Sequence, residues 1–156
     1  MDILLPGMRS VSNLHVLAGH ISDRLGIISF YIDGLHFNLA VRLFNDRFGI
    51  QTRGGCSCAG TYGHFLLDIE ESFSKDITNE IDKGHFSNKP GWVRLSIHPV
   101  MTNEEAHFLV YACQEVAKHW EDWAEDYVYN PGSNEYDHKE LGGFEKEWVA
   151  SKFSFI

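Results

Sequence analysis

One short glycine-rich loop holds the residues best suited to chemistry. It runs from Arg53 to Gly60 and reads RGGCSCAG. Glycines let a backbone turn sharply or approach a ligand closely. Cys58 is a candidate nucleophile, because a nearby guanidinium such as that of Arg53 lowers the pKa of a thiol. The Arg53 fork also matches the geometry of a carboxylate or a phosphate. A tight loop of small residues without any chemistry is the alternative interpretation.

A metal site is the second chemistry that this region suggests. Cys56, Cys58 and His64 are zinc-type ligands close together in the sequence. However, paired zinc cysteines usually stand two or more residues apart and have a second pair elsewhere. Cys113 lies within an apolar helical pattern, which favours a role in the core. We therefore predict no metal site and keep Cys56 and His64 as candidates that support Cys58.

Composition excludes several classes of protein. The chain has 156 residues, with 13 Lys and Arg against 22 Asp and Glu, and a formal net charge of −9. This balance argues against nucleic-acid binding, which needs clustered cations. No apolar run approaches the roughly 20 residues of a membrane helix, so we expect no membrane partner. Three cysteines do not make a disulfide framework, which indicates a reducing, cytoplasmic location.

Short strands alternate with helices around the loop. The residue 36–48 pattern predicts a helix ended by Gly49, and Thr102 to Glu105 form a capping box at the start of a long helix. We predict an α+β fold, with a small antiparallel or mixed sheet of about three to four strands covered by helices on one face. The expected strands are 13–17, 26–32, 50–52 and 92–97, and the expected helices are 36–48, 62–67, 73–81, 102–127 and 144–150.

Four stretches together resemble one enzyme family. They read DRLGIISF (23–30), GLH (34–36), LFNDRFGI (43–50) and RGGCSCA (53–59). In this order they resemble the C-terminal small domain of class V aminotransferases, the group that includes cysteine desulfurases and selenocysteine lyases. The resemblance implies a fold like the C-terminal domain of fold-type I pyridoxal-phosphate enzymes. It divides the chain into a small domain at 1–129 and a C-terminal extension at 130–156.

The resemblance also implies roles for two residues. Arg53 would bind the α-carboxylate of an amino-acid substrate. Cys58 would attack the sulfur of the cofactor-bound substrate and become a persulfide, with pyridoxal phosphate as the electron sink. Cys56 and Ser57 precede Cys58 where the desulfurases have histidines. The resemblance therefore leaves desulfurase, lyase, aminotransferase and epimerase activities open.

The cofactor site of this family lies mainly on a large N-terminal domain, which supplies the lysine that forms the Schiff base. Lys75, Lys83 and Lys89 do not match that lysine. We therefore expect no cofactor-binding residue in this chain, which would be a C-terminal portion, inactive alone, of an enzyme. Its partners would be the substrate, the absent large domain and a second copy of the parent enzyme. A stand-alone, non-catalytic binding module of the same fold is the alternative.

Overall fold

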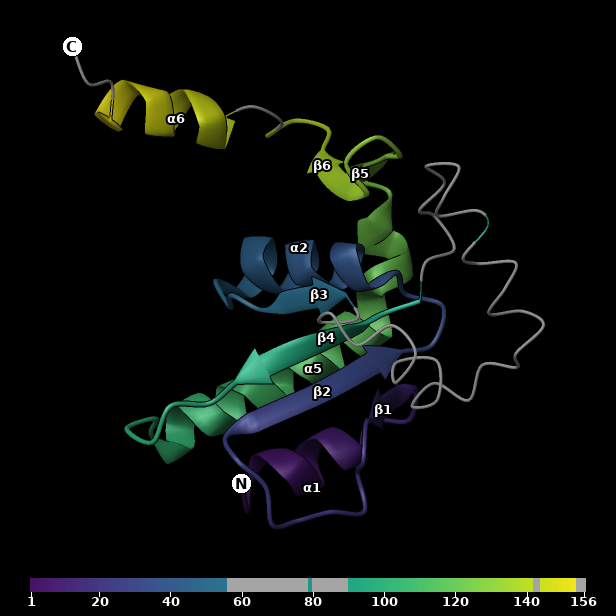
Figure 1. Ribbon diagram of the computed structural model, residues 1–156, viewed down its shortest axis with the longest axis vertical. Helices are drawn as coiled ribbons and strands as arrows, with labels where there is room; N and C mark the ends of the chain where they lie inside the picture. The colour runs from purple at the N-terminus through teal and green to yellow at the C-terminus, as the bar shows by residue number, and fades with distance from the viewer. Residues whose placement is uncertain (56–78, 80–89, 142–143, 154–156) are drawn as a thin grey trace.

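The computed structural model describes residues 1–55, 79, 90–141 and 144–153 (Figure 1). It has the predicted α+β architecture, with one four-stranded antiparallel sheet and one two-stranded sheet. In chain order the elements are α1 (Leu4–Arg9), β1 (Leu14–Val16), β2 (Ile27–Ile32), α2 (Phe37–Phe48), β3 (Arg53–Gly55), β4 (Trp92–Ser96), α5 (Asn103–Ala124), β5 (Tyr127–Asn130), β6 (Glu135–His138) and α6 (Phe144–Phe153).

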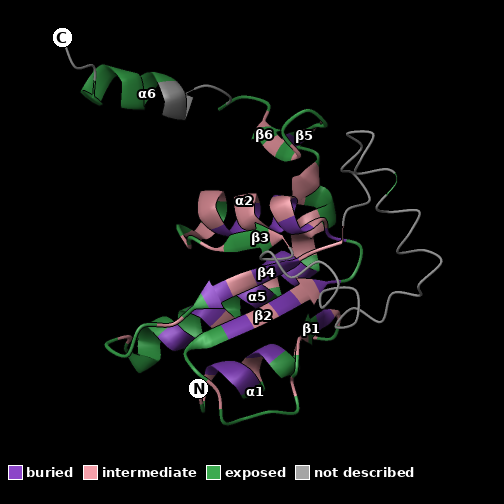
Figure 2. Ribbon diagram, in the orientation of Figure 1, coloured by how far each residue is buried: buried purple, intermediate pink, exposed green. Residues whose placement is uncertain are grey.

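The larger sheet has the strand order β1-β2-β4-β3 and buries one face. On β2, Ile28 and Phe30 are buried, and they lie opposite the buried Leu95 and Val93 of β4. Because side chains alternate along a strand, the residues between them point to the other face. Apolar side chains of α1, α2 and α5 join the buried face in one core (Figure 2). The prediction of helices on one face is thus confirmed.

Helix α2 forms almost as the sequence predicts. His36 is its N-cap residue, and the ring Nδ1 accepts a hydrogen bond of 3.2 Å from the Asn38 amide. Gly49 ends the helix in a left-handed conformation with φ of 66°, which glycine adopts without steric cost. Leu43 and Phe44 are buried on the face toward the sheet.

Helix α5 begins at the predicted capping box, in which Thr102 and Glu105 bond each other's backbone amides. The prediction that it extends to Tyr127 is wrong, because the helix ends at Ala124. Tyr127 instead opens β5, where it is buried and its hydroxyl donates to Asp46 Oδ2 at 2.9 Å. Tyr127 therefore fits the apolar spacing of α5 in the sequence but lies in β5.

Three further expectations differ from the structure. The predicted strand at 50–52 is displaced to Arg53–Gly55, and neither α1 nor the β5–β6 pairing was expected. The predicted helix near 144–150 exists and extends to Phe153. The helices predicted at 62–67 and 73–81 lie outside the described residues. Within the part of the chain that the structure describes, no helix combines the length and apolar character needed to cross a bilayer.

Candidate functional site

The strand that carries Arg53 rests directly on the first turn of α2. A Cβ atom added to Gly54 would lie 2.8 Å from the Phe37 ring and 2.9 Å from Asn38 Oδ1. Such distances leave no room for a side chain, so glycine is required for this close approach. The small residue at Gly54 therefore allows the edge strand β3 to pair with β4 and still pack closely on α2. This packing also fixes the position of the neighbouring Arg53, whose side chain is exposed.

Arg53 lies opposite a second arginine. In the antiparallel register of β3 and β4, Arg53 pairs with Arg94, and Gly54 pairs with Val93. Directly opposed residues of an antiparallel ladder project from the same face with Cβ atoms about 5 Å apart. Val93 is buried in the core, so Arg94 and Arg53 belong to the face away from the helices. We call these two residues the arginine pair.

The arginine pair has no acidic partner in the part of the chain that the structure describes. Among the described residues, no carboxylate forms an ion pair with Arg53 or Arg94, whereas Arg47 pairs with Asp126 at 2.8 Å. In addition, Arg94 Nε is shielded from solvent and has no hydrogen-bond acceptor. Opposed like charges and an unpaired sheltered donor both cost free energy. A bound anion would offset both costs, since guanidinium groups bind carboxylates with two parallel hydrogen bonds.

The same face of the sheet carries further polar groups. Ser29 of β2 lies opposite Arg94, and Tyr31 lies opposite His15 of β1. The His15 and Tyr31 rings stack at 4.7 Å, and His15 Nε2 lies 2.9 Å from Asp33 Oδ2. Burial, together with the charge of Asp33, raises the pKa of Tyr31. The β1–β2 edge is therefore a paired cluster, in contrast to the arginine pair at the β3–β4 edge.

Arg94 is the residue that sequence reasoning missed. Alternation within 92–97 separates it from the core positions, but the pairing of this strand with Arg53 is not visible in the sequence. Of the predicted site residues, Arg53 is described and exposed, while Cys56, Cys58 and His64 lie outside the described residues.

Cys113 has the core role that its helical pattern predicts. It is 1% exposed on α5, and burial raises the pKa of its thiol to about 12. A thiol of this kind stays protonated at neutral pH and is a poor nucleophile. The described part of the chain therefore offers no alternative to Cys58 as a reactive cysteine.

Two observations on the described residues concern metal ligands and lysines. No group of three or more His, Cys, Asp or Glu residues among them could hold a metal ion. Their lysines lie on α5, after β6 and on α6, rather than on the sheet; these are Lys118, Lys139, Lys146 and Lys152. None of them therefore lies on the sheet that carries the arginine pair, and we derive no step through pyridoxal phosphate from them.

Comparison of the sequence with protein-family models finds no match, and comparison with curated proteins finds none either. The functional interpretation therefore depends on the geometry of the arginine pair and on the motif that begins at Arg53.

Proposed function

We propose that this chain is the substrate-carboxylate half of an amino-acid enzyme, the small C-terminal domain of a pyridoxal-phosphate enzyme of the class V aminotransferase group. The observation that carries the proposal is the arginine pair, in which exposed Arg53 lies opposite Arg94 and neither has a carboxylate partner within the described part of the chain. The pair directly precedes the loop in which the motif lies.

The arginine pair would bind and orient the substrate. One guanidinium can hold both oxygens of an α-carboxylate, and a second positive charge on the same face strengthens the attraction. A lysine would keep the charge but lose the two-point geometry. Held in this way, the amino acid has a fixed direction, which is the main contribution that a binding residue makes to catalysis.

Cys58 would act as sulfur acceptor if the enzyme is a desulfurase or selenocysteine lyase. Its thiolate would form a bond to the substrate sulfur as the carbon–sulfur bond breaks, leaving a persulfide on Cys58 and alanine as product. Pyridoxal phosphate would supply the electron sink and would be held by residues outside this chain. An aminotransferase or epimerase would need the arginine pair but not the thiol.

Two experiments test this proposal. In the chain joined to its cofactor-binding domain, we expect L-cysteine to leave a persulfide on Cys58, detected by alkylation and mass spectrometry. Cys58→Ala should abolish it, while full activity of this variant would exclude desulfuration. We expect Arg53→Lys to weaken substrate binding by about tenfold or more, since a charge-assisted pair contributes about 1.5–3 kcal/mol.

A cofactor test separates this domain from a complete enzyme. Added pyridoxal phosphate should give no stable internal aldimine in the absorption spectrum of the chain alone. A stable aldimine would contradict the expectation that the cofactor lysine lies elsewhere.

The proposal includes a cytoplasmic location, which the odd number of cysteines favours.

A further inference from the structure

The C-terminal hairpin, residues 127–138, contacts α2, and Figure 1 shows it beside this helix. This segment includes the residues for which the family resemblance offers no role. It begins directly after α5 and pairs Tyr127 with His138 and Asn130 with Glu135. These contacts bear on the candidate site because β3, the strand of Arg53, also packs against α2.

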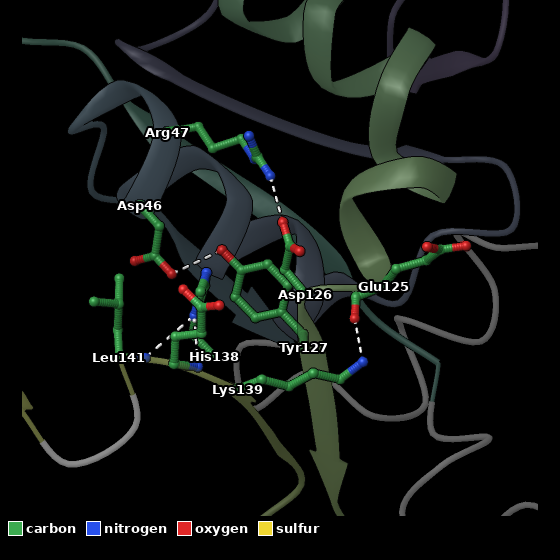
Figure 3. A network of polar contacts seen from close by, with 9 residues as sticks. Asp46, Arg47, Glu125, Asp126, Tyr127, His138, Lys139 and Leu141 are labelled. Atoms are coloured by element: carbon green, nitrogen blue, oxygen red, sulfur yellow. Dashed lines mark hydrogen bonds and ion pairs between the residues drawn. The ribbon is translucent and has the colours of Figure 1, made fainter.

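Two polar contacts join the base of the hairpin and the residue just before it to the last turns of α2, and a third joins the base to the end of α5 (Figure 3). The Tyr127 hydroxyl donates to Asp46 at 2.9 Å, and Arg47 pairs with Asp126 at 2.8 Å. Lys139 donates to the Glu125 carbonyl and so closes the hairpin base onto the end of α5. Of these contacts, the one between Tyr127 and Asp46 is partly buried, and it helps to hold the hairpin and α2 in one relative orientation.

The tip of the hairpin is joined to the first turn of α2. The Asn38 side chain donates to the carbonyl of Asn134, which adopts a positive φ of 57°. The His36 ring, which caps α2, packs against Tyr136 at 5.4 Å and Tyr129 at 5.9 Å. The hairpin therefore covers the residues that start the helix.

Asn38 connects the hairpin to the site strand. The same side chain that donates to Asn134 also packs close to Gly54, beside Arg53: its Oδ1 atom would lie 2.9 Å from a Cβ atom added there. We propose that the C-terminal hairpin is a positioning element for Arg53: by holding both ends of α2, it fixes the helix turn on which β3 rests. This inference rests on the proposed function, because it assigns Arg53 to carboxylate binding.

The experiment uses the full chain and its Asn38→Ala variant, in which alanine favours the helix and only the side-chain contacts are lost. Amide hydrogen exchange reports local opening of each strand. We expect the β3 amides (Arg53–Gly55) to exchange about two- to tenfold faster, as loss of one hydrogen bond implies, and the β1 amides to be unchanged. The affinity for L-alanine, read from the side-chain Nε–Hε signal of Arg53, should fall by a similar factor.

Two other variants control for general destabilisation. Asn134→Gly keeps the positive φ and the carbonyl but removes the acceptor of the Tyr129 hydroxyl, and it should act in the same direction more weakly. Thr102→Ala removes the cap of α5, far along the chain from the hairpin, and should change neither β3 exchange nor affinity.

The outcomes separate this inference from the proposed function. Unchanged β3 exchange in both hairpin variants would overturn the inference, as would faster exchange with unchanged affinity. Equal effects in Thr102→Ala would also overturn it, because they would reflect global stability alone. If the unmodified chain shows no response to L-alanine, the proposed function fails, while the exchange data still decide whether the hairpin holds β3.

Discussion

The polar side chains at the two edges of the larger sheet differ in whether they are paired with each other. At the β1–β2 edge, His15 stacks on Tyr31 and pairs with Asp33, so each polar group has a partner within the chain. At the β3–β4 edge, Arg53 and Arg94 face each other with no acid between them among the described residues. Both edges belong to one sheet, but among the described residues only the β3–β4 edge has opposed positive charges without an acidic partner.

The difference supports the proposal that the β3–β4 edge binds a ligand. A paired cluster adds to stability or is neutral, since exposed ion pairs contribute about 0–1 kcal/mol. Opposed arginines lower stability instead, and residues that lower stability are typical of binding sites. The arginine pair is therefore better explained by an anion from outside than by the needs of folding.

The largest predicted effect is at Gly54. Gly54→Ala should destabilise the chain by about 1–3 kcal/mol, because the new methyl group would overlap Phe37 and Asn38. Urea unfolding measures the change. Gly132→Ala is the matched control, since its Cβ would meet only Asn130 Oδ1 at 3.4 Å, and it should stay within about 0.5 kcal/mol. Similar losses in both variants would show that β3 does not depend on its contact with α2.

A second prediction is that low pH destabilises the β3–β4 edge, which packs on α2, without affecting the β1–β2 edge. Burial lowers the pKa of His36, so the unfolded chain binds a proton at a higher pH than the folded chain. The stability from this group is therefore present above about pH 6.5 and is lost as pH falls toward the lowered folded pKa. Protonation of Nδ1 would remove the acceptor for the Asn38 amide and so uncap α2.

The variant His36→Asn keeps a capping acceptor that does not titrate. Between pH 7.5 and 5 it should lose less stability than the parent chain, by on the order of 1 kcal/mol, the usual contribution of an N-cap. Exchange of the β3 amides should follow pH in the parent, while β1 amides should differ little between parent and variant. Identical pH profiles of parent and variant would refute the role of His36.

The smallest predicted effects are changes in the free energy of unfolding, which have opposite signs for variants at the two edges. Arg53→Gln should raise the free energy of unfolding by about 0.2–1 kcal/mol in the absence of ligand, because it removes an opposed like charge. Asp33→Asn should lower it, by no more than about 0.5 kcal/mol, since the pair with His15 is largely exposed. Urea unfolding at low salt measures both. A stability loss in Arg53→Gln would mean that Arg53 has a structural partner.

Sequence patterns predicted the regular elements better than the connections between them. Alternation and capping residues gave β2, α2 and the start of α5 within one or two residues, because these signals are local. The ends that depend on tertiary contacts were missed: Tyr127 continues the apolar pattern of α5 but is held in β5 by its bond to Asp46.

The candidate site shows the same division. The loop motif made Arg53 a candidate from residue types alone, and the structure places it in an exposed position on β3. Arg94 could not be found in this way, because its relation to Arg53 depends on strand register across some forty residues of chain. The role of Asn38 was likewise hidden, since it follows from the packing of Gly54 on α2 rather than from a motif.

The most direct test of the account is a titration of the chain with L-alanine, followed by NMR at the arginine side chains. We predict saturable shifts of the Nε–Hε signals of Arg53 and Arg94, with little change at the His15 ring. L-Alaninamide, which lacks the carboxylate, should produce no such shifts. Absence of any response at the arginine pair, or equal responses to both compounds, would contradict the claim that this edge of the sheet binds a carboxylate.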